Sequence, residues 1–295
     1  MTRRILVPLD GSVTAEAILP YVVSLARATN ASLLLLRIVT PGEISQSLFW
    51  KTTIPAELRR EWTEEALTRA NVYLTSVAER LRARDLHVVF DVQPAEDAAT
   101  AIVVRAEHDA NVRLIAMTTH GYGGALRWAF GSVAAKVLHA APTPLLVVRS
   151  NGVERPSVTE VSYRTICVPL DGSPLAEQAL ATAQPIAARI GASLLLVCVV
   201  TGDDIVEACN YLEGVAERLR ADHLDVQTYV VEGIPADQII YVAQTGHADL
   251  IVMATHGRTG LRQIWLGSVA TKVVHSSELP VLLVRAQDDE ENVER

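Results

Sequence analysis

The 295-residue chain lacks the residue patterns of several common protein classes. It has only three cysteines, Cys167, Cys198 and Cys209, and they show neither a CxxC pair nor a metal-ligand spacing. Two of them lie in apolar runs, which indicates buried thiols in a reducing compartment. No apolar run reaches the roughly 18 residues that a membrane-spanning helix needs, and the first residues show no secretory leader. We therefore expect a cytoplasmic protein with no membrane partner.

Positive charge is also scarce. The chain has 26 Lys and Arg residues against 34 Asp and Glu residues, which gives a formal net charge of −8. Nucleic-acid-binding domains usually carry a basic patch, and no cluster of Lys and Arg residues stands out in this sequence. We therefore expect no nucleic-acid partner.

Three well-known catalytic and cofactor motifs are absent. The Walker A pattern GxxxxGK[ST] does not occur, which disfavours a P-loop NTPase. No GxGxxG follows the first strand-like run, residues 5–9, which disfavours a dinucleotide-binding fold. No GxSxG nucleophile elbow is found either. Because no catalytic base is positioned by these patterns, the sequence favours binding over catalysis.

The chain does contain an internal duplication, since three blocks of sequence occur twice in the same order. These blocks are VPLDGS within residues 4–12 and 165–173, VAERLRA at 77–83 and 215–221, and a gap-free match between 131–149 and 267–285. Such repetition predicts two copies of one domain. The predicted divisions are a first domain at 1–150, a polar linker at 151–163, a second domain at 164–287 and an acidic tail at 288–295.

Each copy alternates short apolar runs with helix-like stretches. The expected strands are 5–9, 32–39, 88–92, 114–118 and 144–149 in the first copy, and 165–170, 193–200, 226–232, 249–254 and 280–285 in the second. The expected helices are 14–29, 63–84, 95–108 and 132–140, then 174–190, 205–221, 236–246 and 268–276. Continuous apolar strands separated by helices predict an α/β fold with parallel strands covered on both faces. In such a doubly wound sheet, a ligand binds beyond the carboxyl ends of the strands.

Matching polar residues follow the first strand of each copy. Asp10 and Asp171 each stand in the sequence Pro-Leu-Asp-Gly-Ser, which begins at Pro8 or Pro169. An Asp or Ser directly before a helix can be an N-cap. The other interpretation is contact with a ribose, an adenine or a phosphate-bound metal.

A second matching segment leaves the fourth strand. In both copies a His-Gly pair is followed, after nine residues, by Gly-Ser and then a helix, with Gly131-Ser132 and Gly267-Ser268 at the helix start. Backbone N–H groups at a helix N-terminus favour anions such as phosphate. His120 and His256 could contact phosphate, act as general bases or bond to the loop backbone.

Apolar residues close the second strand of each copy. Ile38 and Val199 could pack against a purine ring, or they could simply belong to the core.

Together these residues resemble the universal stress protein family. The resemblance rests on VPLDGS, on the Thr-His-Gly exit with nine residues to Gly-Ser, and on the closing PxLxVR strand, and it covers nearly the whole chain as two tandem domains. It implies a five-stranded parallel sheet in the order 3-2-1-4-5 in each domain. The family's pattern G-x2-G-x9-G-[ST] marks members that bind ATP. The resemblance also implies that fifth strands pair across a dimer interface. The two copies of one chain could form this pairing within the molecule, and a homodimer is expected as a further possibility.

The resemblance identifies a set of nucleotide-binding residues by position. In the first copy they are Pro8, Asp10, Ile38, Thr118, His120, Gly121, Gly124, Gly131, Ser132 and Val133. In the second copy they are Pro169, Asp171, Val199, Ala254, His256, Gly257, Arg258, Gly260, Gly267, Ser268 and Val269.

Both copies depart from the family pattern. Its first glycine is replaced by Thr118 and by Ala254, whose Cβ atoms could crowd a nucleotide. In the first copy, Val92 stands where the second copy has Gly233, and the counterpart of Arg258 is missing. These differences favour the second copy as the better site.

We therefore expect a regulatory protein that binds an adenine nucleotide in response to stress. ATP is the expected ligand, with AMP or a cyclic nucleotide as alternatives and Mg²⁺ as a companion ion. Two other functions stay open, a slow ATPase or phosphotransferase and a ligand-free structural dimer module. The insertion in residues 41–62 carries Phe49, Trp50 and Trp62, and it could form a lid, a dimer surface or a packed loop.

Overall fold

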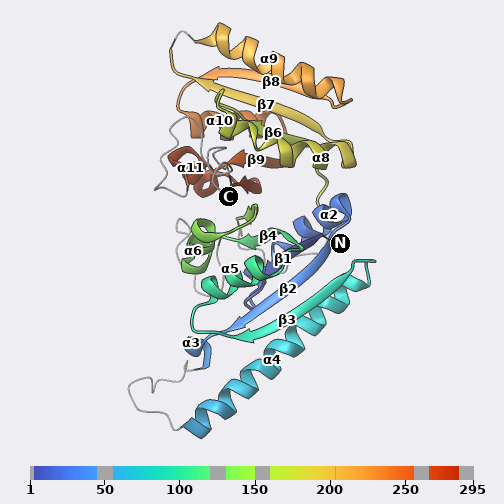
Figure 1. The fold of residues 1–295 in the computed structure, drawn as a ribbon, viewed down its shortest axis with the longest axis vertical. Helices are drawn as coiled ribbons and strands as arrows, with labels where there is room; N and C mark the ends of the chain where they lie inside the picture. The colour runs from blue at the N-terminus through green and yellow to red at the C-terminus, as the bar shows by residue number, and fades with distance from the viewer. Residues whose placement is uncertain are drawn as a thin grey trace, which may run out of the picture. The chain divides into compact units, whose positions relative to one another are not determined.

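The computed structural model describes residues 3–44, 56–119, 131–149, 160–202, 204–255 and 266–285. The chain divides into two compact units, residues 1–142 with 150–160 and residues 143–149 with 161–295 (Figure 1). Because these units follow packing and not sequence repetition, the domain boundaries expected from the repeat stay a prediction.

The first unit is a parallel sheet with the strand order β3-β2-β1-β4. Its strands are β1 (Arg4–Pro8), β2 (Ser32–Val39), β3 (Val88–Pro94) and β4 (Val112–Thr118). Its helices are α1 (Val13–Glu16), α2 (Leu19–Thr29), α3 (Pro41–Ile44), α4 (Ala56–Arg82), α5 (Ala98–His108) and α6 (Ser132–Ala140).

The second unit has the strand order β5-β10-β9-β6-β7-β8. Its strands are β5 (Leu145–Val148), β6 (Thr165–Pro169), β7 (Ser193–Val200), β8 (Val226–Glu232), β9 (Leu250–Ala254) and β10 (Val281–Val284). Its helices are α7 (Pro174–Glu177), α8 (Leu180–Ile190), α9 (Ile205–Ala221), α10 (Pro235–Thr245) and α11 (Ser268–Ser276). The order β8-β7-β6-β9-β10 is the expected 3-2-1-4-5 arrangement of parallel strands. Strand β5 adds to it antiparallel, with Leu146 opposite Leu282.

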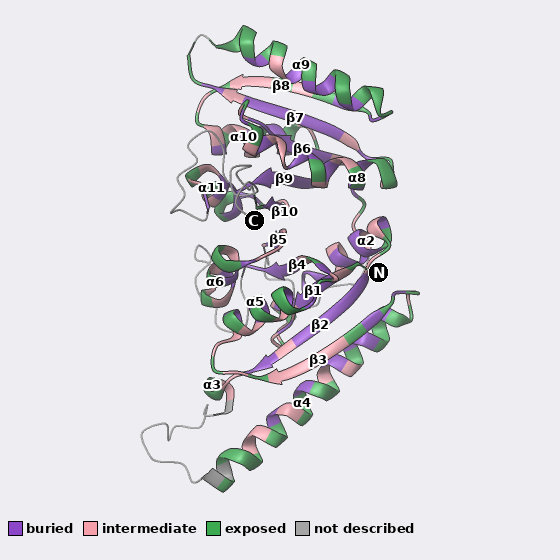
Figure 2. Cartoon of the chain, viewed as in Figure 1, coloured by how far each residue is buried: buried purple, intermediate pink, exposed green. Residues whose placement is uncertain are grey.

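Burial on both sheet faces explains the long apolar strands. Leu33 to Leu36 of β2 are all 2% exposed or less, and Leu194 to Val197 of β7 are 1% exposed or less. Consecutive residues of a strand point to opposite faces, so both faces must be covered. Figure 2 shows the inner strands of each unit as buried, between helices whose outer sides are exposed.

Two expected helices are each split in the structure. Residues 14–29 form α1 and α2, and residues 174–190 form α7 and α8. At both breaks the backbone makes tighter i→i+3 hydrogen bonds, such as Ile18 N to Ala15 O and Ala179 N to Ala176 O. A short turn of this kind ends one helix and redirects the next.

The insertion of the first copy is partly described. Helix α4 begins at Ala56, seven residues earlier than expected, and α3 occupies residues 41–44. Phe49 and Trp50 lie outside the described residues. The buried-thiol expectation is confirmed for Cys167 and Cys198 and wrong for Cys209, which is exposed on α9, and burial raises the pKa of Cys167 to about 12. Among the described residues, no helix is both long and apolar enough to cross a membrane.

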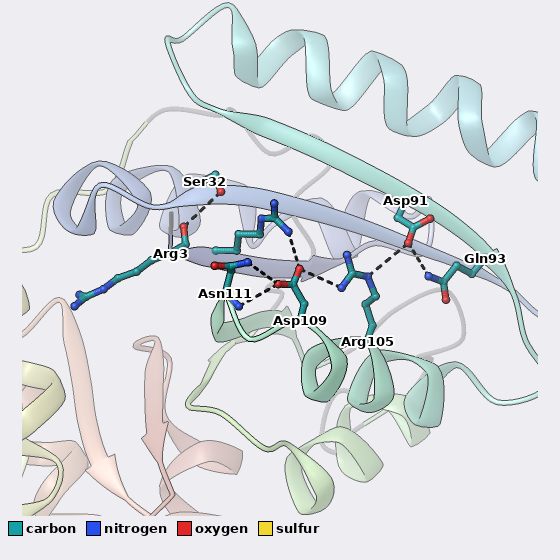
Figure 3. Close-up of polar contacts among 8 residues, drawn as sticks. Arg3, Ser32, Asp91, Gln93, Arg105, Asp109 and Asn111 are labelled. Carbon is teal, nitrogen blue, oxygen red and sulfur yellow. Dashed lines mark hydrogen bonds and ion pairs between the residues drawn. The ribbon is translucent and has the colours of Figure 1, made fainter. Parts of the chain in front are cut away.

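A charged network fixes the amino ends of β1 and β4 in the first unit (Figure 3). Asp109 Oδ2 lies 2.7 Å from Arg4 Nη1 and 3.1 Å from Arg105 Nη1, and Asp109 Oδ1 accepts from Asn111 N at 3.0 Å. Arg105 Nε also lies 3.6 Å from Asp91 Oδ2. The second unit secures the matching corner differently, since Asp249 Oδ2 accepts from the backbone nitrogens that begin β6.

This network predicts an acid-sensitive contribution to stability. Burial raises the pKa of Asp109, but hydrogen bonds from Arg4, Asn111 and Arg105 outweigh it and lower the pKa from 3.8 to about 2. Because the folded pKa lies below the unfolded one, the contribution is present above about pH 4 and is lost as pH falls through about 2. We expect Asp109→Asn to cost up to about 2 kcal/mol at pH 7, and the cost to disappear near pH 2.

The measurement is urea unfolding of both proteins between pH 7 and pH 2. Asp91→Asn is the control, because the Asp91 side chain is 37% exposed and its ion pair with Arg105 is longer. A cost for Asp109→Asn that stays constant down to pH 2 would contradict this assignment.

Candidate functional site

The turn after the first strand of each repeat is built in the same way. Asp10 Oδ1 accepts hydrogen bonds from Ser12 N at 2.9 Å and from Ser12 Oγ at 2.6 Å. In the second repeat, Asp171 Oδ1 accepts from Ser173 N at 3.0 Å and from Ser173 Oγ at 2.6 Å. The glycine between Asp and Ser has a φ of +87° in the first repeat and +83° in the second, a conformation that favours glycine.

Ser12 and Ser173, and not the aspartates, cap the following helices. Ser12 Oγ accepts from Ala15 N at 3.0 Å, and Ser173 Oγ accepts from Ala176 N at 3.1 Å. Each serine hydroxyl therefore joins the aspartate to the first turn of the helix. The N-cap interpretation holds for the serines and is wrong for Asp10 and Asp171.

The loop after the fourth strand is closed at its base in both repeats. Gly131 N donates to Thr119 O at 2.9 Å, and Gly267 N donates to Thr255 O at 2.8 Å. These bonds hold the start of α6 beside the end of β4, and the start of α11 beside the end of β9. A Cβ atom on Gly267 would lie 3.1 Å from Thr255 O, so close approach to this carbonyl favours glycine there.

The helices that follow these loops begin without a side-chain cap. Gly131 and Gly267 are the N-cap residues of α6 and α11, and neither helix has a side-chain hydrogen bond at its N-cap. Ser132 and Ser268 are exposed at the first helical position. The first N–H groups of a helix have no partner within the helix, so these ends can accept an anion.

Parallel pairing brings the two segments of each repeat to one edge of the sheet. Strand β1 pairs with β4, and β6 pairs with β9, in both cases in parallel. The turn at Asp10 and the loop base at Gly131 therefore lie at the carboxyl ends of neighbouring strands. The same holds for Asp171 and Gly267.

Other expected site residues differ in how accessible they are. Ile38 is 5% exposed and Val199 is half-buried, so Ile38 is a core residue at its strand end. Thr118 and Ala254 end their strands in buried positions. The remaining described members of the set are Pro8, Val133, Pro169 and Val269, of which Pro169 is buried and the others half-buried. His120, Gly121, Gly124, His256, Gly257, Arg258 and Gly260 lie outside the described residues.

The matching of Val92 to Gly233 is wrong. Gly233 N donates to Val200 O, and the equivalent bond in the first repeat runs from Ala95 N to Val39 O. Ala95 is therefore the counterpart of Gly233, because strand pairing and not the apolar pattern sets the register. The argument that Val92 weakens the first site no longer applies.

Matching lysines tie the Gly-Ser helices to their neighbours. Lys136 of α6 lies 2.5 Å from Asp97 at the start of α5, and Lys272 of α11 lies 2.7 Å from Asp237 of α10. Hydrogen bonds from Lys136 and Thr100 lower the pKa of Asp97 to about 2. The two helix starts are thus held in the same way in both repeats.

Sequence reasoning missed a second set of matching residues near the aspartates. Glu16 and Glu177 each lie four residues after the capping serine, and each pairs with an arginine of the long helix, Arg80 or Arg218. Both arginines are the fourth residue of the repeated block VAERLRA. The position of these residues in the repeat was the signal that could have found them.

The serine caps lead to a stability prediction. Ser12→Ala and Ser173→Ala should each cost about 1 kcal/mol, because each removes an N-cap hydrogen bond. Urea unfolding of the two variants measures this. Ser24→Ala is the control, since the Ser24 hydroxyl bonds only to Pro20 O inside α2. Serine variants that are no less stable than Ser24→Ala would contradict the capping role.

Comparison with known proteins gives a consistent result. The model of the universal stress protein family matches residues 1–149, 162–208 and 202–285. A universal stress protein of Mycobacterium tuberculosis is 29% identical over 205 residues, which cover 63% of this chain and 66% of that protein. The match thus spans just under two thirds of that relative's length.

One solved structure agrees in fold over nearly the whole chain. A universal stress protein from Archaeoglobus fulgidus has a TM-score of 0.73 at 21% identity, with 97% of both chains covered. A shorter universal stress protein from the same organism, solved in complex with dAMP, is 25% identical over 42% of this chain, with a TM-score of 0.36. Because the family model matches both repeats, this chain belongs to the universal stress protein family.

Proposed function

We propose that each repeat binds an adenine nucleotide, with ATP as the ligand, and that the protein is a stress-response regulator without strong catalytic activity. The observation that carries this proposal is the duplicated arrangement at the carboxyl ends of the strands. In both repeats, a helix N-terminus without a side-chain cap begins beside the turn that holds Asp10 or Asp171.

The helix starts suit the phosphates of the nucleotide. Free N–H groups and the positive end of the helix dipole favour an anion without any lysine. This accounts for phosphate binding by a chain whose net charge is −8. The exposed hydroxyls of Ser132 and Ser268 add a donor at each start.

The aspartates suit a different part of the ligand. A carboxylate repels phosphate but accepts hydrogen bonds from hydroxyl and amino groups. We therefore assign Asp10 and Asp171 to the ribose or the adenine. A Mg²⁺ ion would come with the phosphates of ATP.

The pairing of fifth strands supports a further part of the proposal. Strand β5 comes from the first sequence repeat, and it lies antiparallel to β10, the last strand of the second repeat. We propose that the two domains of one chain pair through these strands. Such pairing would cover strand edges that otherwise invite association with other chains.

A charge placed at each helix start tests the nucleotide sites. Ser132→Asp and Ser268→Asp introduce a carboxylate where the phosphates would lie. We expect each change to weaken ATP binding at its own site by at least about ten-fold, or ~1.4 kcal/mol. Stability should be unchanged or slightly higher, because an acidic residue in the first turn favours a helix.

Isothermal titration calorimetry and thermal unfolding measure the two effects. Asn71→Asp on α4 and Asn210→Asp on α9 are the controls. Both residues are exposed, and each substitution adds the same negative charge away from the Gly-Ser helix starts. Equal ATP affinity in all four variants would overturn the proposal. The nucleotide itself can be identified by heating purified protein and analysing what is released by chromatography and mass spectrometry.

A further inference from the structure

In each repeat, a tyrosine, a glutamate and an arginine lie together next to the aspartate turn, which is formed by residues 10–12 or 171–173. The tyrosines are Tyr73 and Tyr211, each four residues before the block VAERLRA. The glutamates end the short helices α1 and α7. The duplication repeats these residues, although the glycine-serine pattern does not include them.

The second repeat shows the complete set of contacts. Glu177 Oε1 accepts from Tyr211 Oη at 3.1 Å, and Glu177 Oε2 lies 2.7 Å from Arg218 Nη2. Tyr211 and Arg218 are seven residues apart on α9, so they lie on one face of the helix. Burial and the charges of Glu177 and Asp171 raise the pKa of Tyr211, so its hydroxyl keeps the proton that it donates.

The first repeat shows one contact fewer. Glu16 Oε2 lies 2.6 Å from Arg80 Nη2. The hydroxyl of Tyr73 is buried, and it has no hydrogen-bond partner among the described residues. Burial raises the pKa of Tyr73, followed by the charge of Glu16 and by an interaction between the Tyr73 hydroxyl and the Glu16 side chain, so these two groups lie close together without an ordinary hydrogen bond.

The glutamates are joined directly to the aspartate turns. Glu16 N donates to Ser12 O at 3.2 Å, and Glu177 N donates to Ser173 O at 3.2 Å. The same serines hold Asp10 and Asp171 through their hydroxyls. Because α1 and α7 have only four residues each, they are too short to be stable without packing against another element.

We propose that Glu16 and Glu177 are positioning residues, which tie the aspartate turn of each nucleotide site to the long helix α4 or α9. The proposal rests on the nucleotide binding proposed above. Because of these contacts, a movement of the long helix also moves the aspartate, so the positions of α4 and α9 are coupled to nucleotide binding. The coupling is tighter in the second repeat, where the tyrosine adds a hydrogen bond.

An isolated surface ion pair contributes little to stability, and Arg218 is 65% exposed. The glutamates are more enclosed, at 15% exposed for Glu16 and 30% for Glu177. Their effect is therefore expected on the geometry of the turn more than on global stability.

The test uses the full chain with one site disabled at a time. In a Ser132→Asp background, Glu177→Ala is compared with Glu213→Ala, which removes a different ion pair of the same helix, that with Arg220. We expect Glu177→Ala to weaken ATP binding about ten-fold, within the usual range for coupled sites. The backbone amides of residues 173 and 175–177 should also exchange hydrogen faster. Glu213→Ala should change neither quantity.

Two further variants separate positioning from folding. Arg218→Ala changes an exposed residue and should weaken ATP binding several-fold in the same background, with unchanged circular dichroism. Tyr211→Phe should weaken binding at the second site. Tyr73→Phe, tested in a Ser268→Asp background, should weaken the first site less than Tyr211→Phe weakens the second, because only Tyr211 makes an ordinary hydrogen bond to its glutamate among the described residues.

The outcomes are distinguishable. Equal binding and equal exchange rates for Glu177→Ala and Glu213→Ala would overturn the positioning role. Equal losses for Tyr211→Phe and Tyr73→Phe would overturn the difference between the repeats. If the unaltered protein binds no adenine nucleotide, the proposed function fails, and the exchange rates of the amides of residues 173 and 175–177 still decide whether Glu177 holds the turn.

Discussion

Burial of the parallel strands on both faces is the constraint on which the rest of each unit depends. Leu33 to Leu36 and Leu194 to Val197 can be buried only if helices cover both sides of the sheet, which requires a crossover after each strand. Parallel strands then end at the same edge. The turn at Asp10 and the loop base at Gly131 therefore lie at the same edge although they are far apart in the chain, and the same holds for Asp171 and Gly267.

The duplication separates the features that both repeats keep from those in which they differ. The Asp-Gly-Ser turn, the closed loop base and the lysine tie at the Gly-Ser helix occur in both repeats with nearly equal distances. The amino ends of the strands, in contrast, are held by an Arg4–Asp109–Arg105 network in one unit and by Asp249 with backbone nitrogens in the other. The two repeats therefore stabilise that edge with different contacts.

The glutamates link the site to the longest helices of their units. Glu16 and Arg80 are 64 residues apart, and Glu177 and Arg218 are 41 residues apart. A four-residue helix has little stability of its own, and for this reason we propose that the contact positions its capping serine and the adjacent aspartate. The proposed nucleotide site therefore rests on two elements, a strand end and a long helix, which this contact joins.

The sequence alone determined the duplication, the fold class and the bounds of elements such as β7, α9, α6 and α11. Their apolar runs and glycine-serine starts are local signals, and local signals need no knowledge of the neighbours. The tertiary structure decided the split of α1 from α2, the capping by Ser12 and Ser173, and the match of Gly233 to Ala95. It also decided which tyrosine meets which glutamate. These features depend on strand register and on contacts between residues distant in the chain, and the local sequence pattern determines neither.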